Sequence, residues 1–122
     1  MSYVDGYVLP VPKRNLAAYR RMAAKACKVW CDHGALQYVE SVAEDVKPGK
    51  WTSFPQSVKA KAGETVVFAF VVYKSRAHRD QVNRKAMKDP RLAGMCDVKK
   101  MPFDGKRMFW GGFKTIVKSG KR

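Results

Sequence analysis

One stretch constrains the fold more than any other part of this sequence. Residues 65–73 read Thr-Val-Val-Phe-Ala-Phe-Val-Val-Tyr, with no Gly or Pro inside the run. A short run of β-branched and aromatic residues, bounded by glycine and polar residues, predicts a strand rather than a buried helix. Because side chains alternate along a strand, both faces of this strand are apolar. We therefore expect a central strand in a sheet that is covered on both sides.

Apolar spacing and turn signals predict the other elements. The pattern indicates strands over residues 3–10, 35–46 and 107–117, with helices over residues 16–33 and from Ser75 to Asp89. Asn15 and Ser75 are suitable helix N-caps, and Gly34 stands where a helix-ending glycine belongs. Residues 48–56 are predicted to be a loop, and residues 57–61 an edge extension of the sheet. A further short helix is expected from Pro90 to Met95.

The order strand, helix, strand, strand, helix, strand predicts a ferredoxin-like α+β sheet. Its first and third strands would be central, and its two helices would cover one face. Leaving four large side chains of the central strand in water would forgo roughly 6–12 kcal/mol, at about 1.5–3 kcal/mol each. We therefore expect a homodimer through the sheet face, a dimeric α+β barrel. Residues 1–117 would form one domain, and residues 118–122 a basic tail.

The charge balance and the absence of long apolar runs bear on partners and location. The chain has 25 Lys and Arg against 10 Asp and Glu, a net charge of +15. Such a balance favours a polyanionic partner such as RNA, or serves only solubility. No apolar run approaches the ~18 residues of a membrane span, and the N-terminus lacks a signal-peptide pattern. With an odd number of cysteines, 3, these features indicate a cytoplasmic protein without membrane contact.

Several polar residues on the predicted apolar faces are candidate site residues. His78 lies on the inward stripe of the second helix, as an acid or base or as a core histidine with a backbone partner. Asp5, Tyr7 and Glu40 lie on strands whose faces should be covered, where a carboxylate must be paired or neutral. Arg107 is a candidate partner, because the first and last strands are neighbours in this topology, either in a structural ion pair or as an anchor for an anionic ligand.

Aromatic residues and cysteines suggest further structural or functional roles. Phe54 and Trp110 could form the walls of a ligand pocket, pack in the core or stack on single-stranded bases. Cys27 and Cys31 share a helix face near His33, but Cys27 belongs to the apolar stripe. We therefore expect buried or free thiols, no metal site and no cofactor.

Five blocks of the sequence carry a resemblance to a known family. They are Tyr-Val-Asp-Gly-Tyr-Val-Leu-Pro-Val-Pro (residues 3–12), Trp30 with His-Gly-Ala-Leu (33–36), Gly-Lys-Trp-Thr-Ser-Phe-Pro (49–55), Ser-Arg-Ala-His-Arg-Asp (75–80) and Met-Pro-Phe-Asp-Gly-Lys-Arg-Met (101–108). The chain resembles the YbaA-like family of small uncharacterised bacterial proteins. The resemblance implies a ferredoxin-like, dimeric α+β barrel fold and supplies no established activity.

Three functions stay open at this point. The first is a small-molecule binding protein or enzyme, with a pocket between sheet and helices near His78, Tyr7, Asp5, Phe54 and Trp110. The second is a basic RNA-binding accessory protein. The third is a structural or stress-related dimer without a ligand.

Overall fold

A computed structural model of the chain describes residues 2–93 and 101–120. The strands are β1 (Tyr3–Pro12), β2 (Gln37–Val42), β3 (Glu64–Tyr73) and β4 (Phe109–Lys114). The α-helices are α1 (Leu16–Asp32), α2 (Phe54–Ser57) and α3 (Arg76–Met87), with 3-10 turns at Lys13–Asn15, Pro90–Leu92 and Gly105–Arg107. None of the helices in these two ranges is long and apolar enough to cross a membrane.

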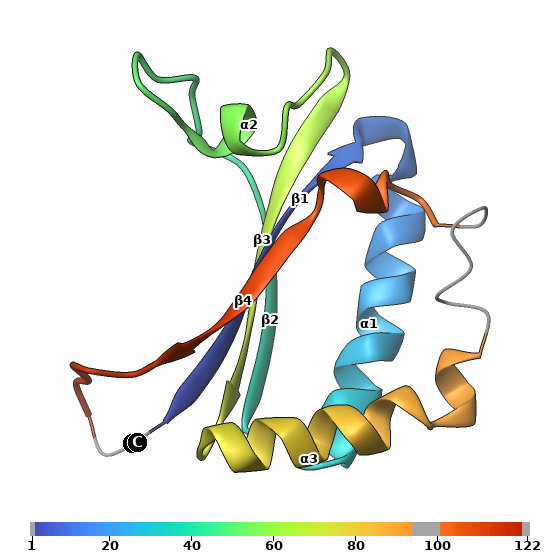
Figure 1. The fold of residues 1–122 in the computed structure, drawn as a ribbon. Helices are drawn as coiled ribbons and strands as arrows, with labels where there is room; N and C mark the ends of the chain where they lie inside the picture. The colour runs from blue at the N-terminus through green and yellow to red at the C-terminus, as the bar shows by residue number, and fades with distance from the viewer. Residues whose placement is uncertain (1, 94–100, 121–122) are drawn as a thin grey trace.

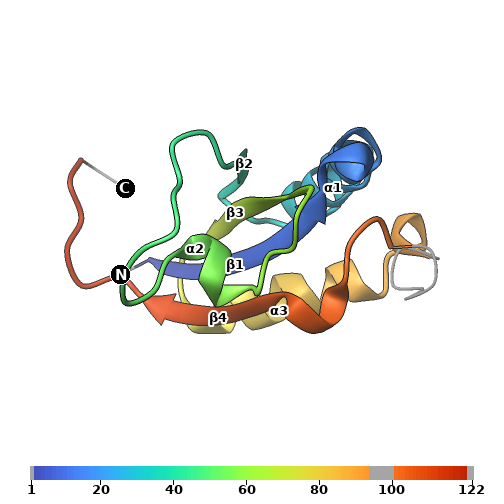
Figure 2. The same ribbon diagram turned by 90° about the horizontal axis from the view of Figure 1, so that it is seen from above.

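The strands form one antiparallel sheet in the order β2-β3-β1-β4, visible from above in Figure 2. The predicted central position of β3 is thus confirmed, and β1 is the other central strand. The register aligns Glu40 of β2 with Ala69 of β3, Ala69 with Tyr7 of β1, and Tyr7 with Trp110 of β4. Paired residues share a face of a sheet, so these four form one row.

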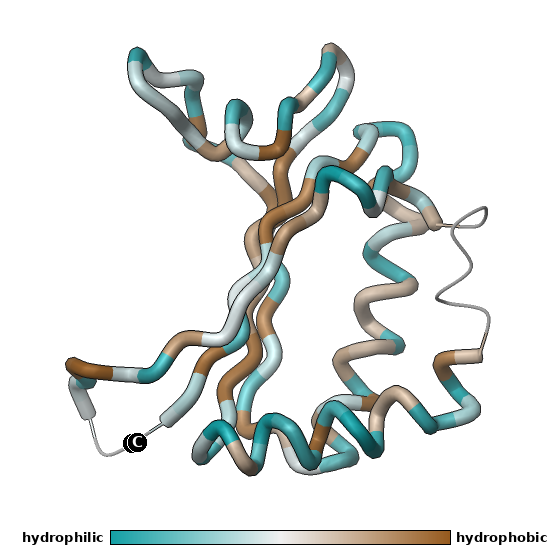
Figure 3. The backbone as a smooth tube through the Cα atoms, viewed as in Figure 1, coloured by the Kyte–Doolittle hydropathy of each residue, from teal (hydrophilic) through white to brown (hydrophobic). Residues whose placement is uncertain are grey.

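Helices α1 and α3 lie on the same side of the sheet (Figure 1). Tyr19 and Ala23 of α1 pack against Leu9 and Val67 of the sheet, and Val82 of α3 joins the neighbouring cluster of the sheet. Figure 3 shows apolar residues concentrated along the strands, whereas α3 is mainly hydrophilic. The apolar stripe of each helix therefore forms the core with the inner face of the sheet.

The opposite face of the sheet stays largely open in the described part of the chain. Val8 pairs with Phe68 and Phe109, which places all three on this face. Phe68, Phe109 and Phe113 are 44%, 47% and 65% exposed. Only the end near α2 is covered, where Val58 is buried against Val8. Four antiparallel strands and two helices on one side thus leave an apolar surface in contact with solvent.

Several predicted boundaries were wrong. Strands β2 and β4 are shorter than the apolar patterns suggested. Residues 57–61 do not extend the sheet, because the chain forms the short helix α2, which ends at Ser57. Ser53 caps this helix by accepting a hydrogen bond from the Gln56 backbone N–H, and Pro55 lies in its first turn. The short helix predicted from Pro90 to Met95 is a 3-10 turn at Pro90–Leu92, and Met95 lies outside the described residues.

The predicted helix ends were mostly confirmed. Ser75 accepts a 3.1 Å hydrogen bond from the His78 backbone N–H and caps α3. Gly34 has a φ of 115°, which suits the residue after a helix end. Asn15 precedes α1 as predicted, but its side chain donates to the Pro102 carbonyl oxygen at 3.0 Å instead of capping the helix.

A cavity between the sheet and helix α1

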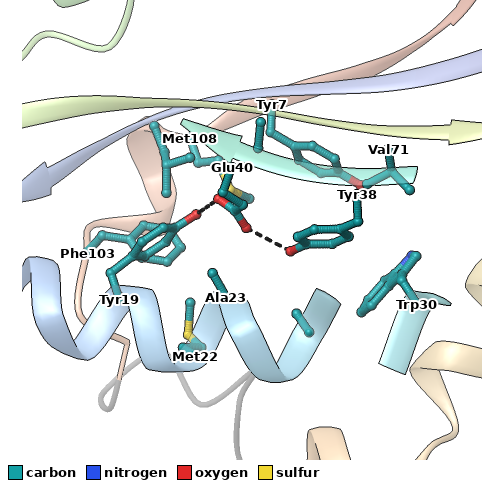
Figure 4. A pocket seen from close by; sticks show the side chains of 13 residues that line it. Tyr7, Tyr19, Met22, Ala23, Trp30, Tyr38, Glu40, Val71, Phe103 and Met108 are labelled. Atoms are coloured by element: carbon teal, nitrogen blue, oxygen red, sulfur yellow. Dashed lines mark hydrogen bonds between the residues drawn. The ribbon is translucent and has the colours of Figure 1, made fainter. Parts of the chain in front are cut away.

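A cavity of about 160 Å³ lies between the inner face of the sheet and α1. Its floor is the row of Ala69 and Tyr7, where the small Ala69 side chain leaves space on the central strand. Most of its lining is apolar or aromatic (Figure 4). The lining residues are Tyr7, Leu9, Tyr19, Met22, Ala23, Ala26, Trp30, Tyr38, Glu40, Ala69, Val71, Phe103 and Met108.

Glu40 is the charged group in this lining, and two phenols hold its carboxylate. The Tyr19 hydroxyl donates to Oε1 at 2.5 Å, and the Tyr38 hydroxyl donates to Oε2 at 2.7 Å. Tyr38 and Glu40 are two residues apart on β2, so their side chains lie on the same face. Tyr19 reaches the same carboxylate from α1, so the arrangement connects helix and sheet across the cavity (Figure 4).

The phenols of the cavity stay protonated. Burial, and after it the negative charge of Glu40, raises the pKa of Tyr19 and of Tyr38 well above the ordinary value of 10.0. Burial, followed by the charge of Asp5, raises the pKa of Tyr7 to about 12. Tyr19 and Tyr38 are therefore neutral hydrogen-bond donors at neutral pH.

Glu40 takes part in none of the ion pairs found in residues 2–93 and 101–120. It also borders a second space, an outer groove of about 450 Å³ between α1 and β2. The groove and the cavity share Tyr19, Ala23, Tyr38 and Glu40. The carboxylate thus stands between the interior and a groove that opens to solvent, and in the described ranges it has no ion-pair partner.

The buried Asp5 has a different partner from the one the sequence suggested. Arg79 of α3 donates from Nη1 to Asp5 Oδ1 at 2.8 Å. The expected partner, Arg107, instead donates to both carboxylate oxygens of Glu64 at 2.7 and 2.6 Å, and to Asp104 at 3.0 Å. Arg107 belongs to this ion-pair cluster because the turn at Gly105–Arg107 places it beside the start of β3.

The sheet register brings three of the predicted site residues together. Tyr7 and Glu40 line the cavity. The Trp110 ring stacks on Tyr7, with 5.9 Å between ring centroids, at the edge of the same face. Phe54 lies on the other face of the sheet, against Phe68.

His78 is not among the residues that line the cavity. Its Nδ1 accepts a hydrogen bond from the Lys74 backbone N–H at 3.0 Å, and its ring packs against Tyr73. An acid–base role for His78 stays a prediction.

Four of the five aromatic lining residues were not predicted to form a site: Tyr19, Trp30, Tyr38 and Phe103. In the sequence, Tyr19 and Trp30 fit the apolar stripe of the helix over residues 16–33, because their spacing is that of a buried helix face. The available signal was the pair Tyr38 and Glu40, two polar-tipped residues at strand spacing on a face that must be covered.

The cysteine and histidine pattern of α1 does not form a metal-ligand cluster in the described residues. Cys27 and Cys31 are free thiols. His33 is directed elsewhere: its Nε2 lies 2.8 Å from Asp89 Oδ2.

Comparison with known proteins agrees with the resemblance predicted from the sequence blocks. The family model described as "Protein of unknown function (DUF1428)" matches residues 2–105. The "Uncharacterized protein YbaA" of Escherichia coli strain K12 is 49% identical over 117 residues, covering 96% of this chain and 98% of that protein. The protein of the same name from Shigella flexneri has the same identity and coverage.

Among solved structures, the de novo designed protein Foldit4 covers 97% of this chain and 100% of its own, at 10% identity and a TM-score of 0.46. A structural similarity with a TM-score this low gives no information about function. The family match spans most of the chain, and the relatives align over nearly their whole length. The chain belongs to the DUF1428 family and is a relative of the YbaA proteins.

Proposed function

We propose that this protein binds a small, mainly apolar molecule in the cavity between the sheet and α1. The observation that carries the proposal is a cavity of about 160 Å³ whose lining, within the residues that the structure describes, is aromatic and aliphatic with a single carboxylate, Glu40. An apolar cavity of about 150 Å³ is large enough to bind benzene. Ligand sites typically combine such a lining with a few polar groups that fix orientation.

Glu40 retains hydrogen-bonding capacity for a ligand. An ionised carboxylate has about four acceptor positions, and each of its two oxygens receives one phenol hydrogen bond here. The phenols hold the carboxylate in place, so that its orientation is set before a ligand arrives. Preorganisation of this kind reduces the entropy lost on binding.

The test uses benzyl alcohol as a neutral probe of suitable size. We expect it to shift the amide resonances of residues around the cavity in ¹H–¹⁵N NMR spectra. Ala23→Leu should abolish the response, because the larger side chain of this buried residue fills the space. Ala17→Leu makes the same change at an exposed position of α1 and should preserve it. Equal binding to both variants, or no response around the cavity of the native protein, would contradict the proposal.

We also propose that a second copy of the chain covers the open sheet face, completing a ferredoxin-like dimeric α+β barrel. Phe68, Phe109 and Phe113 support this proposal, because all three lie exposed on one face. Large contiguous apolar patches on a folded surface mark interaction sites. The face carries the same residues in both copies, as a two-fold interface requires.

RNA binding is a second candidate function, favoured by the position of the basic residues. Both helices present exposed Arg and Lys away from the sheet: Arg20, Arg21, Lys25 and Lys28 on α1, and Arg76, Arg84 and Lys85 on α3, followed by Lys88 just after its end. Single-stranded RNA bound in this way would show a log–log salt dependence of about −0.7 per phosphate neutralised. An affinity that does not change with salt would exclude this candidate. If neither RNA nor the cavity probe binds, the third candidate function remains: a structural or stress-related dimer without a ligand.

A further inference from the structure

We propose that the cavity selects small cationic amines, meaning protonated aryl- or alkylammonium compounds. This inference rests on the proposed binding function and assigns the chemical class of its ligand. It depends on three properties of the lining: its aromatic faces, its charge and the state of its hydrogen-bond donors.

Five aromatic rings line the cavity: Tyr7, Tyr19, Trp30, Tyr38 and Phe103. The face of an aromatic ring carries negative electrostatic potential, and it attracts ammonium groups within about 6 Å. Aromatic cages are a recurring means of ammonium recognition for this reason. Figure 4 shows that these rings come from α1, from two strands and from the segment that contains Phe103, so they surround the space from several sides.

The charge of the lining also favours a cation. Among the described residues that line the cavity, Glu40 is the carboxylic acid, and none of them is Lys, Arg or His. The next charges beyond Tyr7 are Asp5 and Arg79, which compensate each other through their ion pair. Arg20 lines the outer groove, on the exposed side of α1. An anionic ligand would therefore meet a carboxylate of the same charge, whereas an ammonium group would neutralise it.

The hydrogen-bond donors of the lining are largely occupied. The Tyr19 and Tyr38 hydroxyls donate to Glu40. The Trp30 indole N–H donates to Asn83 Oδ1 at 2.9 Å. These groups are unavailable to a carboxylate or carbonyl of a ligand, while Glu40 still accepts. The cavity is thus suited to a ligand that brings its own N–H donors.

The experiment compares three probes of similar shape by isothermal titration calorimetry at neutral pH and low salt. The probes are benzylamine, which is protonated under these conditions, benzyl alcohol and benzoate. We expect benzylamine to bind the native protein about tenfold or more tightly than benzyl alcohol, in line with hydrogen bonds to charged groups. Benzoate should bind most weakly. Raising the pH until the amine is neutral should reduce its affinity to that of the alcohol.

Glu40→Gln removes the charge and nearly preserves the shape. We expect it to eliminate the preference for benzylamine, so that benzylamine and benzyl alcohol bind the variant with similar affinity. Glu44→Gln removes the same charge from an exposed position and should retain the preference. Tyr19→Phe and Tyr38→Phe keep the charge of Glu40 but each removes one hydrogen bond that orients the carboxylate, so the preference for benzylamine should persist and be smaller.

The outcomes separate this inference from the cavity proposal. If benzyl alcohol binds and is lost in Ala23→Leu, but benzylamine has no advantage, the cavity proposal stands and the amine preference is wrong. The amine preference would also be wrong if benzoate bound more tightly than benzylamine, or if a folded Glu40→Gln variant still bound benzylamine more tightly than benzyl alcohol. If Glu40→Gln does not fold, the pH titration of the native protein tests the inference instead. An affinity for benzylamine that does not fall when the amine becomes neutral would then overturn it. If no probe binds, both proposals fail.

Discussion

Arg79 of α3 donates a hydrogen bond of 2.8 Å from Nη1 to Oδ1 of Asp5, a fully buried residue on the central strand β1. The Arg79 guanidinium also contacts Asp80 and lies 5.0 Å from the centroid of the Tyr3 ring. Burial raises the pKa of Asp5, while the charge of Arg79 opposes that rise. This ion pair connects α3 to the sheet at a point where neither charge reaches bulk water freely.

We predict that Arg79→Met destabilises the protein by about 3–5 kcal/mol, because it leaves the Asp5 carboxylate buried without its cation. The double variant Asp5→Asn with Arg79→Met should recover a large part of the loss, since the uncompensated charge is then absent. Urea unfolding measures the free energy of unfolding of the single and the double variant. Arg84→Met, at an exposed position of the same helix, is the control. An Arg79→Met variant as stable as this control would show that the pair contributes little.

Asp89 should contribute to the acid sensitivity of the fold. The Arg91 side chain first, then the Arg91 backbone N–H and His33, hold the pKa of Asp89 well below its usual 3.8. The folded state therefore binds this proton less readily than the unfolded chain does. The stabilisation is complete above the unfolded pKa of about 3.8, and it is lost as the pH falls through the lower folded pKa.

We therefore expect Asp89→Asn to lower the free energy of unfolding near neutral pH and to make the decline below about pH 4 shallower. Urea unfolding across a pH series provides the measurement. Asp45→Asn, at an exposed position, should leave the profile unchanged. A profile for Asp89→Asn parallel to the native one would contradict the assignment.

Gly112 of β4 provides space for Tyr3. A Cβ atom at position 112 would lie 2.7 and 2.8 Å from two ring carbons of Tyr3, closer than real contacts allow. We predict that Gly112→Ala displaces the Tyr3 ring from Arg79 and costs about 1–3 kcal/mol, as overpacking does. At the neighbouring Gly111 the nearest atom would be 3.6 Å away, so Gly111→Ala should be tolerated. Thermal denaturation compares the two, and equal melting temperatures would refute the prediction.

The proposed dimer depends on the open sheet face. Phe113 lies on this face, opposite Val4, and is 65% exposed. We predict that Phe113→Glu converts a dimer to a monomer in light scattering coupled to size exclusion, because it would bury a charge in the interface. Lys114→Glu, at the next residue of β4, changes the other face and should preserve the dimer. A native protein with the mass of one chain would exclude the proposal.

The site could be predicted only in part. Tyr7 and Glu40 were identified from the sequence because a polar group on a strand with two covered faces is unusual. Tyr19, Tyr38 and Trp30 resembled ordinary core residues, since periodicity reports burial and not which buried groups face a cavity. The partner of Asp5 was misassigned because neighbouring strands suggested Arg107, whereas an arginine on a helix can reach the same carboxylate from above the sheet.

The sequence by itself determined the order of the elements, the central place of β3 and the apolar character of both its faces. These properties follow from local patterns, in which each residue's neighbours along the chain carry the signal. Tertiary structure alone decided the register that aligns Glu40, Ala69 and Tyr7, and the position of Tyr19 above them. The physical reason is that strand register and helix packing depend on contacts between segments far apart in the chain, and a cavity exists only where those segments leave space.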